Sequence, residues 1–273
     1  MDQPDAIVVN NPWQQLRQFT AARIALGRTG VSLPTHPQLA FQLAHAKARD
    51  AVHLPLDVTQ LALDIERLGV APAASCLQLE SAAGERLRYL QRPDLGRCLS
   101  EKSKNLLGAL PQSATKPQYD MAFVIADGLS ALAVAQNAAP FLAALTQRIK
   151  PENWSVAPVS IVSLGRVAVA DEVAELLGAR LVVLLIGERP GLSSPDSMGL
   201  YVTWMPRVGL NDAHRNCISN VRPAGLSYDD AAFKLHYLLS EMYKRQLSGV
   251  QLKDETAGNP DLVAVQRGNF LLG

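Results

Sequence analysis

A carboxylate and a guanidinium stand side by side at the end of the most apolar run in the chain. In ARLVVLLIGERPGL (179–192), the uncharged segment Leu181–Gly187 is followed at once by Glu188, Arg189 and a Pro-Gly turn. A short run of Val, Leu and Ile bounded by Gly and Pro is typical of a strand buried on both faces, as in parallel sheets covered by helices. Ligands bind beyond the carboxyl ends of such strands, so Glu188 and Arg189 are either ligand-binding groups or solvated loop residues.

Cys217 is a second candidate for chemistry, because it lies three residues after His214. This nearness is compatible with nucleophilic catalysis, whereas a lone Cys more often serves as a small buried hydrophobe. The three cysteines and five histidines do not cluster with metal-ligand spacing, so we predict no metal-binding residue. The chain also lacks the sequence motifs of common dinucleotide, P-loop, α/β-hydrolase and zinc-protease sites.

Composition limits the class of protein. The chain has 273 residues, 48% of them hydrophobic, and a formal net charge of +1. This near-neutral charge gives no reason to expect a nucleic acid or an anionic membrane as partner. No apolar segment approaches the ~18 residues that a membrane span needs, and the amino terminus does not resemble a secretion signal. With scattered cysteines that suit a reducing compartment, the sequence predicts a cytoplasmic protein.

Strands and helices alternate in the carboxy-terminal half of the chain. This alternation predicts an α/β domain at 116–249, with a Rossmann-like, mostly parallel sheet and flanking helices. The expected strands are 121–126, 156–162, 181–186 and 199–204, and the expected helices are 130–149, 171–177 and 227–247.

The residues before this domain have a different pattern of apolar residues. Apolar spacing predicts a mainly helical region at 1–115, and two alternating segments around Gly84 predict a small β-hairpin within it. Residues 250–273 are predicted to be a flexible carboxy-terminal extension. The expected helices are 13–26, 39–48, 58–68 and 95–107, and the hairpin strands are 76–80 and 86–90.

Three glycine-containing loops follow the first three strands of the α/β domain. They read DGLS (127–130), GRV (165–167) and GERPG (187–191), and they should meet at one edge of the sheet. Glycine lets a backbone approach a ligand closely, so the loops mark a site without naming its ligand. Asp127 either contacts that ligand or caps the following helix. Arg189 either reaches an anionic group or pairs with an acidic residue to hold its loop.

The motifs taken together resemble the ethanolamine ammonia-lyase small-subunit family. The resemblance covers the chain from about Trp13 to about Ser248. The motifs that carry it are, in order, RPDLGR (92–97), DGLS (127–130), GRV (165–167), LLGARLVVLLIGERPGL (176–192) and CISN (217–220).

This resemblance implies an adenosylcobalamin-dependent lyase that converts ethanolamine to acetaldehyde and ammonia by a radical mechanism. It implies a hetero-oligomer in which a TIM-barrel large subunit holds the substrate and the small subunit closes over the lower side of the cobalamin. The family's cofactor-binding positions fall on Val167, Glu188 and Cys217, and no catalytic residue is expected in this chain. The resemblance further implies a cytoplasmic enzyme, enclosed in a bacterial microcompartment in some systems.

The sequence is also compatible with two other functions. A stand-alone α/β enzyme or binding protein for a phosphorylated small molecule would act without a partner and hold the phosphate at a helix amino terminus. A purely structural subunit would make no contact with the cofactor, and changes at Glu188 and Cys217 would leave cobalamin affinity intact.

Overall fold

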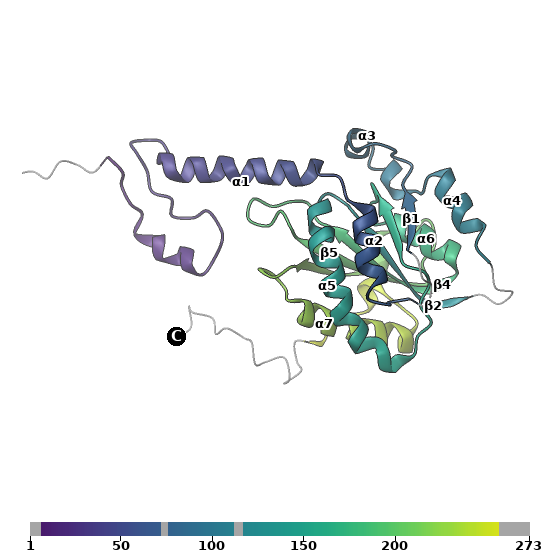
Figure 1. Cartoon of the computed structure of the whole chain (residues 1–273). Coiled ribbons are helices and arrows are strands. Elements are labelled where there is room, and N and C mark those ends of the chain that lie inside the picture. The colour runs from purple at the N-terminus through teal and green to yellow at the C-terminus, as the bar shows by residue number, and fades with distance from the viewer. Residues whose placement is uncertain (1–6, 72–75, 112–116, 257–273) are drawn as a thin grey trace, which may run out of the picture.

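A six-stranded sheet forms the centre of the protein (Figure 1). The computed structural model describes residues 7–71, 76–111 and 117–256. The strand order is β1-β3-β2-β4-β5-β6, with the first four strands parallel to their neighbours and β5 antiparallel to both β4 and β6. This arrangement confirms the predicted α/β class with a mostly parallel sheet. The strands span Leu77–Glu80 (β1), Tyr119–Ala126 (β2), Ser160–Ser163 (β3), Ala179–Gly187 (β4), Met198–Trp204 (β5) and Arg215–Val221 (β6).

Helices flank both faces of the sheet. Helices α2, α5 and α7 build one apolar layer against it, and α4 and α6 build the second layer on the opposite face. We call these the α5 layer and the α6 layer. The helices span Val58–Glu66 (α2), Glu101–Gly108 (α4), Ala131–Ile149 (α5), Val169–Leu177 (α6) and Tyr228–Arg245 (α7).

The central strands β2 and β4 are buried on both sides because their sequences are apolar at every position that faces a helix. Side chains alternate between the two faces of a strand. Phe123 therefore joins the α5 layer and its neighbour Val124 joins the α6 layer. Every residue from Leu181 to Gly187 in β4 is buried. The interpretation of this apolar run as a strand covered on both faces is confirmed.

The predicted β-hairpin around Gly84 is wrong. Its first segment is β1, which pairs in parallel with β3 at the edge of the main sheet. Its second segment forms a short helix, α3, at Arg86–Gln91. The apolar alternation was misleading here, because Leu87 is 60% exposed whereas Tyr89 is fully buried between two arginine side chains. The segment is held in place by burial of this one aromatic ring and not by an apolar face packed in a sheet.

The helices before the sheet are also shorter than expected in two places. The helix expected at 13–26 is reduced to a 3-10 turn at Pro12–Gln18, and the helix expected at 95–107 is divided. A 3-10 turn at Leu95–Arg97 precedes α4, and Ser100, not Asp94, caps α4 by accepting from the N–H of Ser103 at 3.2 Å.

The amino-terminal part extends away from the sheet. It consists of the turn at Pro12–Gln18, an irregular segment and the long helix α1, Thr35–His53, which confirms the second expected helix (Figure 1). The division of the chain into regions at residues 115 and 249 stays a prediction. Within the expected carboxy-terminal extension, Leu252 is buried, and the side-chain amide of Asn216 donates to its carbonyl at 2.8 Å. Residues 257–273 lie outside the described part of the chain.

Candidate functional site

The three glycine-containing loops meet at one edge of the sheet, as predicted. The N–H of Leu129 donates to the carbonyl of Gly187 at 3.0 Å, and the N–H of Gly165 donates to the Asp127 carboxylate at 3.2 Å. Gly128 has a φ of +56°, and a Cβ at this position would lie 2.2 Å from the Gly187 carbonyl oxygen. Only glycine at 128 lets the DGLS and GERPG loops approach this closely.

Asp127 holds this edge together from inside the protein. Its side chain is 6% exposed and lies 3.3 Å from the guanidinium of Arg86. Burial raises the pKa of Asp127 to about 6, although the cation of Arg86 opposes this shift. The expectation that Asp127 caps the following helix is wrong, because Ser130 caps α5 by accepting from the N–H of Ala133. Asp127 therefore ties the DGLS loop to its neighbours.

A stack of one ring and two guanidinium groups positions the GRV loop. The ring of Tyr89 lies between Arg86 and Arg166, with its centroid 4.8 and 4.4 Å from the two guanidinium carbons. Burial raises the pKa of Tyr89 to about 12. The N–H of Arg166 donates to the carbonyl of Gly96 at 2.7 Å, and a Cβ at Gly96 would meet the Arg166 side chain at the same distance. The glycine of the RPDLGR motif thus makes room for the loop that carries Val167.

Val167 lies at the start of α6, beyond the carboxyl end of β3. Its side chain is half-buried against the α6 layer. Val167 also lines a cavity of about 400 Å³. The other lining residues include Arg97, Arg166, Asp212 and Arg215, so an apolar side chain and three guanidinium groups border the same space.

Glu188 lies directly beyond the carboxyl end of β4. Its carboxylate accepts hydrogen bonds from the Ser197 hydroxyl and from the N–H of Asn220, the latter at 3.4 Å. One carboxylate oxygen lies above Gly199 in β5, where an added Cβ would be 2.9 Å away. Glu188 is half-buried, so its side chain is fixed over the sheet while part of it stays accessible. This is the geometry of an oriented acceptor.

Cys217 occupies the middle of β6, directly opposite Tyr201 in β5. Its side chain is exposed, and its sulfur lies 3.5 Å from the Ser219 hydroxyl. Burial, followed by the neighbouring Cys217 and Glu188, raises the pKa of the Tyr201 phenol. Gly199 is two residues before Tyr201 in β5, so the Glu188 carboxylate over Gly199 and Cys217 opposite Tyr201 lie on the same face of β5 and β6.

Helix α6 is connected to this face through a buried ion pair. Asp171 of α6 lies 2.7 Å from the guanidinium of Arg215, and both side chains are 3% exposed. Arg215 is two residues before Cys217, so the two share one face of β6. It also lines the cavity beside Val167. The candidate site is therefore the open part of the β5–β6 face, between the start of α6 and Glu188.

The sequence did not indicate Tyr201, Ser219 or Asn220 as members of this site. All three depend on β6, which was not predicted as a strand. The strand places Cys217 opposite Tyr201 and the N–H of Asn220 beside Glu188. A weak signal was present, because Ile218 and Val221 are apolar among polar neighbours.

Of the two roles expected for Arg189, the pairing with an acidic residue is not found, and the contact with an anionic group of a ligand stays a prediction. Its side chain is exposed, and within the described residues it makes no ion pair with an acidic group. Across the same described ranges, no group of three or more His, Cys, Asp and Glu residues is placed to hold a metal ion. Nor does any helix there have the length and apolar character to cross a membrane.

Comparison with known proteins gives the family. The family profile described as ethanolamine ammonia-lyase light chain (EutC) matches residues 10–253. The ethanolamine ammonia-lyase small subunit of Ralstonia nicotianae is 59% identical over 272 residues, which cover 99% of this chain and 98% of that protein. The small subunit of Azotobacter vinelandii is 57% identical, with 96% of each chain covered. The chain therefore belongs to the ethanolamine ammonia-lyase light-chain family and is a lyase subunit.

Proposed function

We propose that this chain is the small subunit of an adenosylcobalamin-dependent ethanolamine ammonia-lyase, and that Val167, Glu188 and Cys217 contact the lower side of the cofactor. The proposal includes a TIM-barrel large subunit that completes the cofactor site and holds the substrate. It is supported chiefly by one observation: the Glu188 carboxylate over Gly199 and Cys217 opposite Tyr201 lie on the same face of β5 and β6, where Cys217 is exposed.

The residues on this face suit the chemistry of cobalamin's periphery. The corrin rim carries amide side chains, and an oriented carboxylate such as Glu188 accepts strong hydrogen bonds from amide NH2 groups. The Ser197 hydroxyl and the Asn220 N–H hold that carboxylate in place. Val167 offers apolar surface, and Cys217 is small enough to pack beside a large planar ligand.

When bound, adenosylcobalamin supplies the radical chemistry that converts ethanolamine to acetaldehyde and ammonia. The role proposed for this chain is to bind and orient the cofactor from below and to exclude water from that side. We propose no general acid or base in this chain, because substrate chemistry takes place on the opposite face of the cofactor. The proposed location is the cytoplasm, either free or enclosed in a bacterial microcompartment.

The test is co-expression with the large subunit, followed by an absorbance titration with adenosylcobalamin and measurement of ammonia release from ethanolamine. Loss of the charge-assisted hydrogen bonds at Glu188 should weaken cofactor binding about 10- to 100-fold in Glu188→Ala. At saturating cofactor, the KM for ethanolamine should be unchanged.

Asp229→Ala is the matched control, since it removes an exposed carboxylate from α7 on the opposite side of the sheet. It should leave cofactor binding unchanged. If Glu188→Ala changed the KM for ethanolamine while cofactor affinity stayed constant, the assignment of Glu188 would be wrong.

One observation favours a second candidate function. The cavity of about 400 Å³ brings Arg97 and Arg166 to the start of α6, which is an arrangement that suits a phosphate group. A stand-alone protein for a phosphorylated small molecule would bind a phosphate monoester without a partner. Binding of such a compound to the isolated chain, measured by calorimetry, together with no binding of the large subunit, would favour this alternative.

A further inference from the structure

The amino-terminal residues 7–53, which we call the arm, expose an unusual amount of apolar side chain. Trp13 is 66% exposed, and Leu39 and Leu43 of α1 are each 58% exposed. Single exposed apolar residues are common on protein surfaces, whereas a contiguous set marks an interaction site. The other exposed large apolar residues of the arm are Ile7, Val8, Val9, Phe19, Ile24, Val31, Leu33 and Phe41.

Helix α1 lacks the packing that stabilises a protein helix. Of its 19 residues, only Ala51 is buried. An isolated helix of this length is marginally stable in water, and most helical stability in proteins comes from burial of an apolar face. Leu39 and Leu43 are one turn apart, while Phe41 lies on the other side of the helix and stacks on His45. The helix therefore offers apolar surface on two sides, as expected of an element placed between partner surfaces.

The charge of the arm limits what that partner can be. The arm contains five basic residues and one acidic residue, Asp50, whereas the whole chain contains 26 basic and 25 acidic residues. Two arms placed together would repel each other, because like charges at an interface cost free energy. The charge pattern instead fits a partner surface that is acidic as well as apolar. The basic residues are Arg17, Arg23, Arg28, Lys47 and Arg49.

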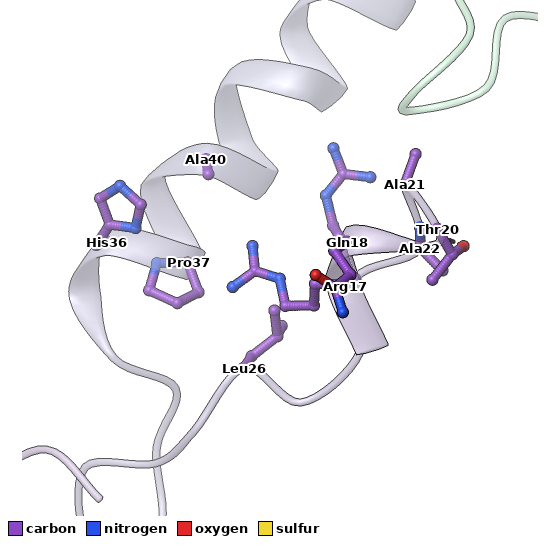
Figure 2. Close-up of a pocket in the computed structure, with 10 residues that line it drawn as sticks. Arg17, Gln18, Thr20, Ala21, Ala22, Leu26, His36, Pro37 and Ala40 are labelled. Carbon is purple, nitrogen blue, oxygen red and sulfur yellow. Dashed lines mark hydrogen bonds between the residues drawn. The ribbon is translucent and has the colours of Figure 1, made fainter. Parts of the chain in front are cut away.

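A hollow within the arm also combines apolar surface with basic side chains. Figure 2 shows Arg17 and Leu26 across an open gap from Pro37 and Ala40, which belong to α1. The cavity has a volume of about 540 Å³. Arg17 forms no ion pair with an acidic residue anywhere in the described ranges. An apolar wall beside an unpaired guanidinium suits an acidic side chain with apolar neighbours.

The arm is joined to the candidate cofactor site through the loop that follows Glu188. The guanidinium of Arg23 donates to the carbonyl of Leu192 and to the hydroxyl of Ser193, both at 3.2 Å. The Ser193 hydroxyl in turn donates to the carbonyl of Ala21 at 3.3 Å. These hydrogen bonds attach the arm to the loop that leads from Glu188 to β5, and so connect it to the candidate site.

We propose that the arm is a docking element that binds an acidic, apolar surface of the large subunit, through Leu39 and Leu43 on α1 and through Arg17 at the hollow. This inference rests on the proposed function, because it takes the large subunit as the partner. It adds a second contact region to the one around the cofactor. In this proposal the arm contributes to the affinity between the two subunits, and the β5–β6 face contacts the cofactor.

The test compares binding of full-length variants to the separately purified large subunit by sedimentation velocity. Leu39→Ser combined with Leu43→Ser, and separately Arg17→Glu, should each weaken binding at least about tenfold. Higher salt should weaken wild-type binding and narrow the difference between Arg17→Glu and wild type. Because these side chains are exposed, circular dichroism and the Tm of the isolated chain should not change.

Two variants outside the arm serve as controls. Leu87→Ser removes an apolar side chain of similar exposure from α3, and Arg67→Glu reverses an exposed charge at the end of α2. Both should bind as wild type does. If the arm variants also bound within twofold of wild type, the arm would not be a docking element, while the proposed function would stand. Failure of the wild-type chain to bind the large subunit would overturn both proposals.

The mass of the isolated chain in solution tests whether the arm binds a second copy of this chain instead of the large subunit. If wild type formed a dimer in sedimentation that the Leu39→Ser/Leu43→Ser variant did not form, the arm would bind a second copy of the chain, and the proposal would be wrong. A wild-type monomer that joins the large subunit through these residues is the expected result.

Discussion

The ion pair between Asp171 and Arg215 fixes α6 to β6 and so sets one wall of the candidate site. The atoms lie 2.7 Å apart and each side chain is 3% exposed. Arginine keeps its charge throughout the pH range in which proteins are folded, so removing Asp171 leaves a buried cation without its anion. We expect Asp171→Ala to lower the free energy of unfolding by about 4 kcal/mol. For a chain of this size, that loss corresponds to a fall in Tm of roughly 8 to 16 °C.

Removal of the other partner, Arg215, should give a loss of stability that depends on pH. Arg215→Met keeps an apolar stem and leaves Asp171 without its cation. Burial already raises the pKa of Asp171 to about 6, so this carboxyl can become neutral by binding a proton. The loss of stability in Arg215→Met should therefore shrink as the pH falls from neutral to about 5.5. The loss in Asp171→Ala should instead grow over the same range, because only the wild type gains stability as the pH falls toward the raised pKa of Asp171. The double variant should recover at least about half of the loss seen in Asp171→Ala.

Urea and thermal unfolding followed by circular dichroism would measure these differences. Glu101→Ala is the control, because it breaks an ion pair with Lys104 that is 3.0 Å long but has its Glu101 side chain 83% exposed. Exposed pairs contribute little to stability. Equal Tm shifts in Glu101→Ala and Asp171→Ala would show that the Asp171–Arg215 pair is not in the interior, and that α6 does not form the wall described here.

Two further predictions concern the edge where the loops meet. Gly187→Ala would place a methyl group 2.0 Å from the backbone oxygen of Ser130, which cannot move aside without separating the loops. This variant should lower the free energy of unfolding in urea by about 3 kcal/mol. Gly108→Ala, which has open space around it, should lower that free energy far less. Burial raises the pKa of Asp127 to about 6, so the stability that this group contributes is complete below its ordinary pKa and is lost as the pH rises through about 6. The total change is about 3 kcal/mol, and Asp127→Asn should remove it from the pH dependence of unfolding; an unchanged pH profile would contradict this assignment.

The two central strands, β2 and β4, could be predicted from the sequence because their apolar runs leave no ambiguity. The segments Met121–Ala126 and Leu181–Gly187 are apolar at every position, and glycine marks the loops that follow. Such runs can satisfy their backbone groups and bury their side chains only in the middle of a covered sheet. The meeting of the DGLS and GERPG loops followed from parallel strand order alone, and it is confirmed.

The peripheral segments could not be predicted in the same way, because their structure depends on contacts that are distant in the sequence. Helix α3 forms around Tyr89, whose ring needs Arg86 and Arg166 on its two sides. Alternation of apolar residues at 86–90 carried no information about Arg166, which is more than 70 residues away. Likewise, the role of Asp127 depends on Arg86 and not on the adjacent helix.

Strand β6 shows why the prediction failed at the candidate site in particular. One of its faces carries Ile218 against the α5 layer, while the other carries Cys217 and Ser219, which no helix covers. A strand with polar residues on an open face has too few apolar residues to be recognised from its pattern. The same openness leaves Glu188 and Tyr201 accessible beside Cys217. Sequence patterns reflect burial within the chain, so a face reserved for a partner or a cofactor is where they carry the least information.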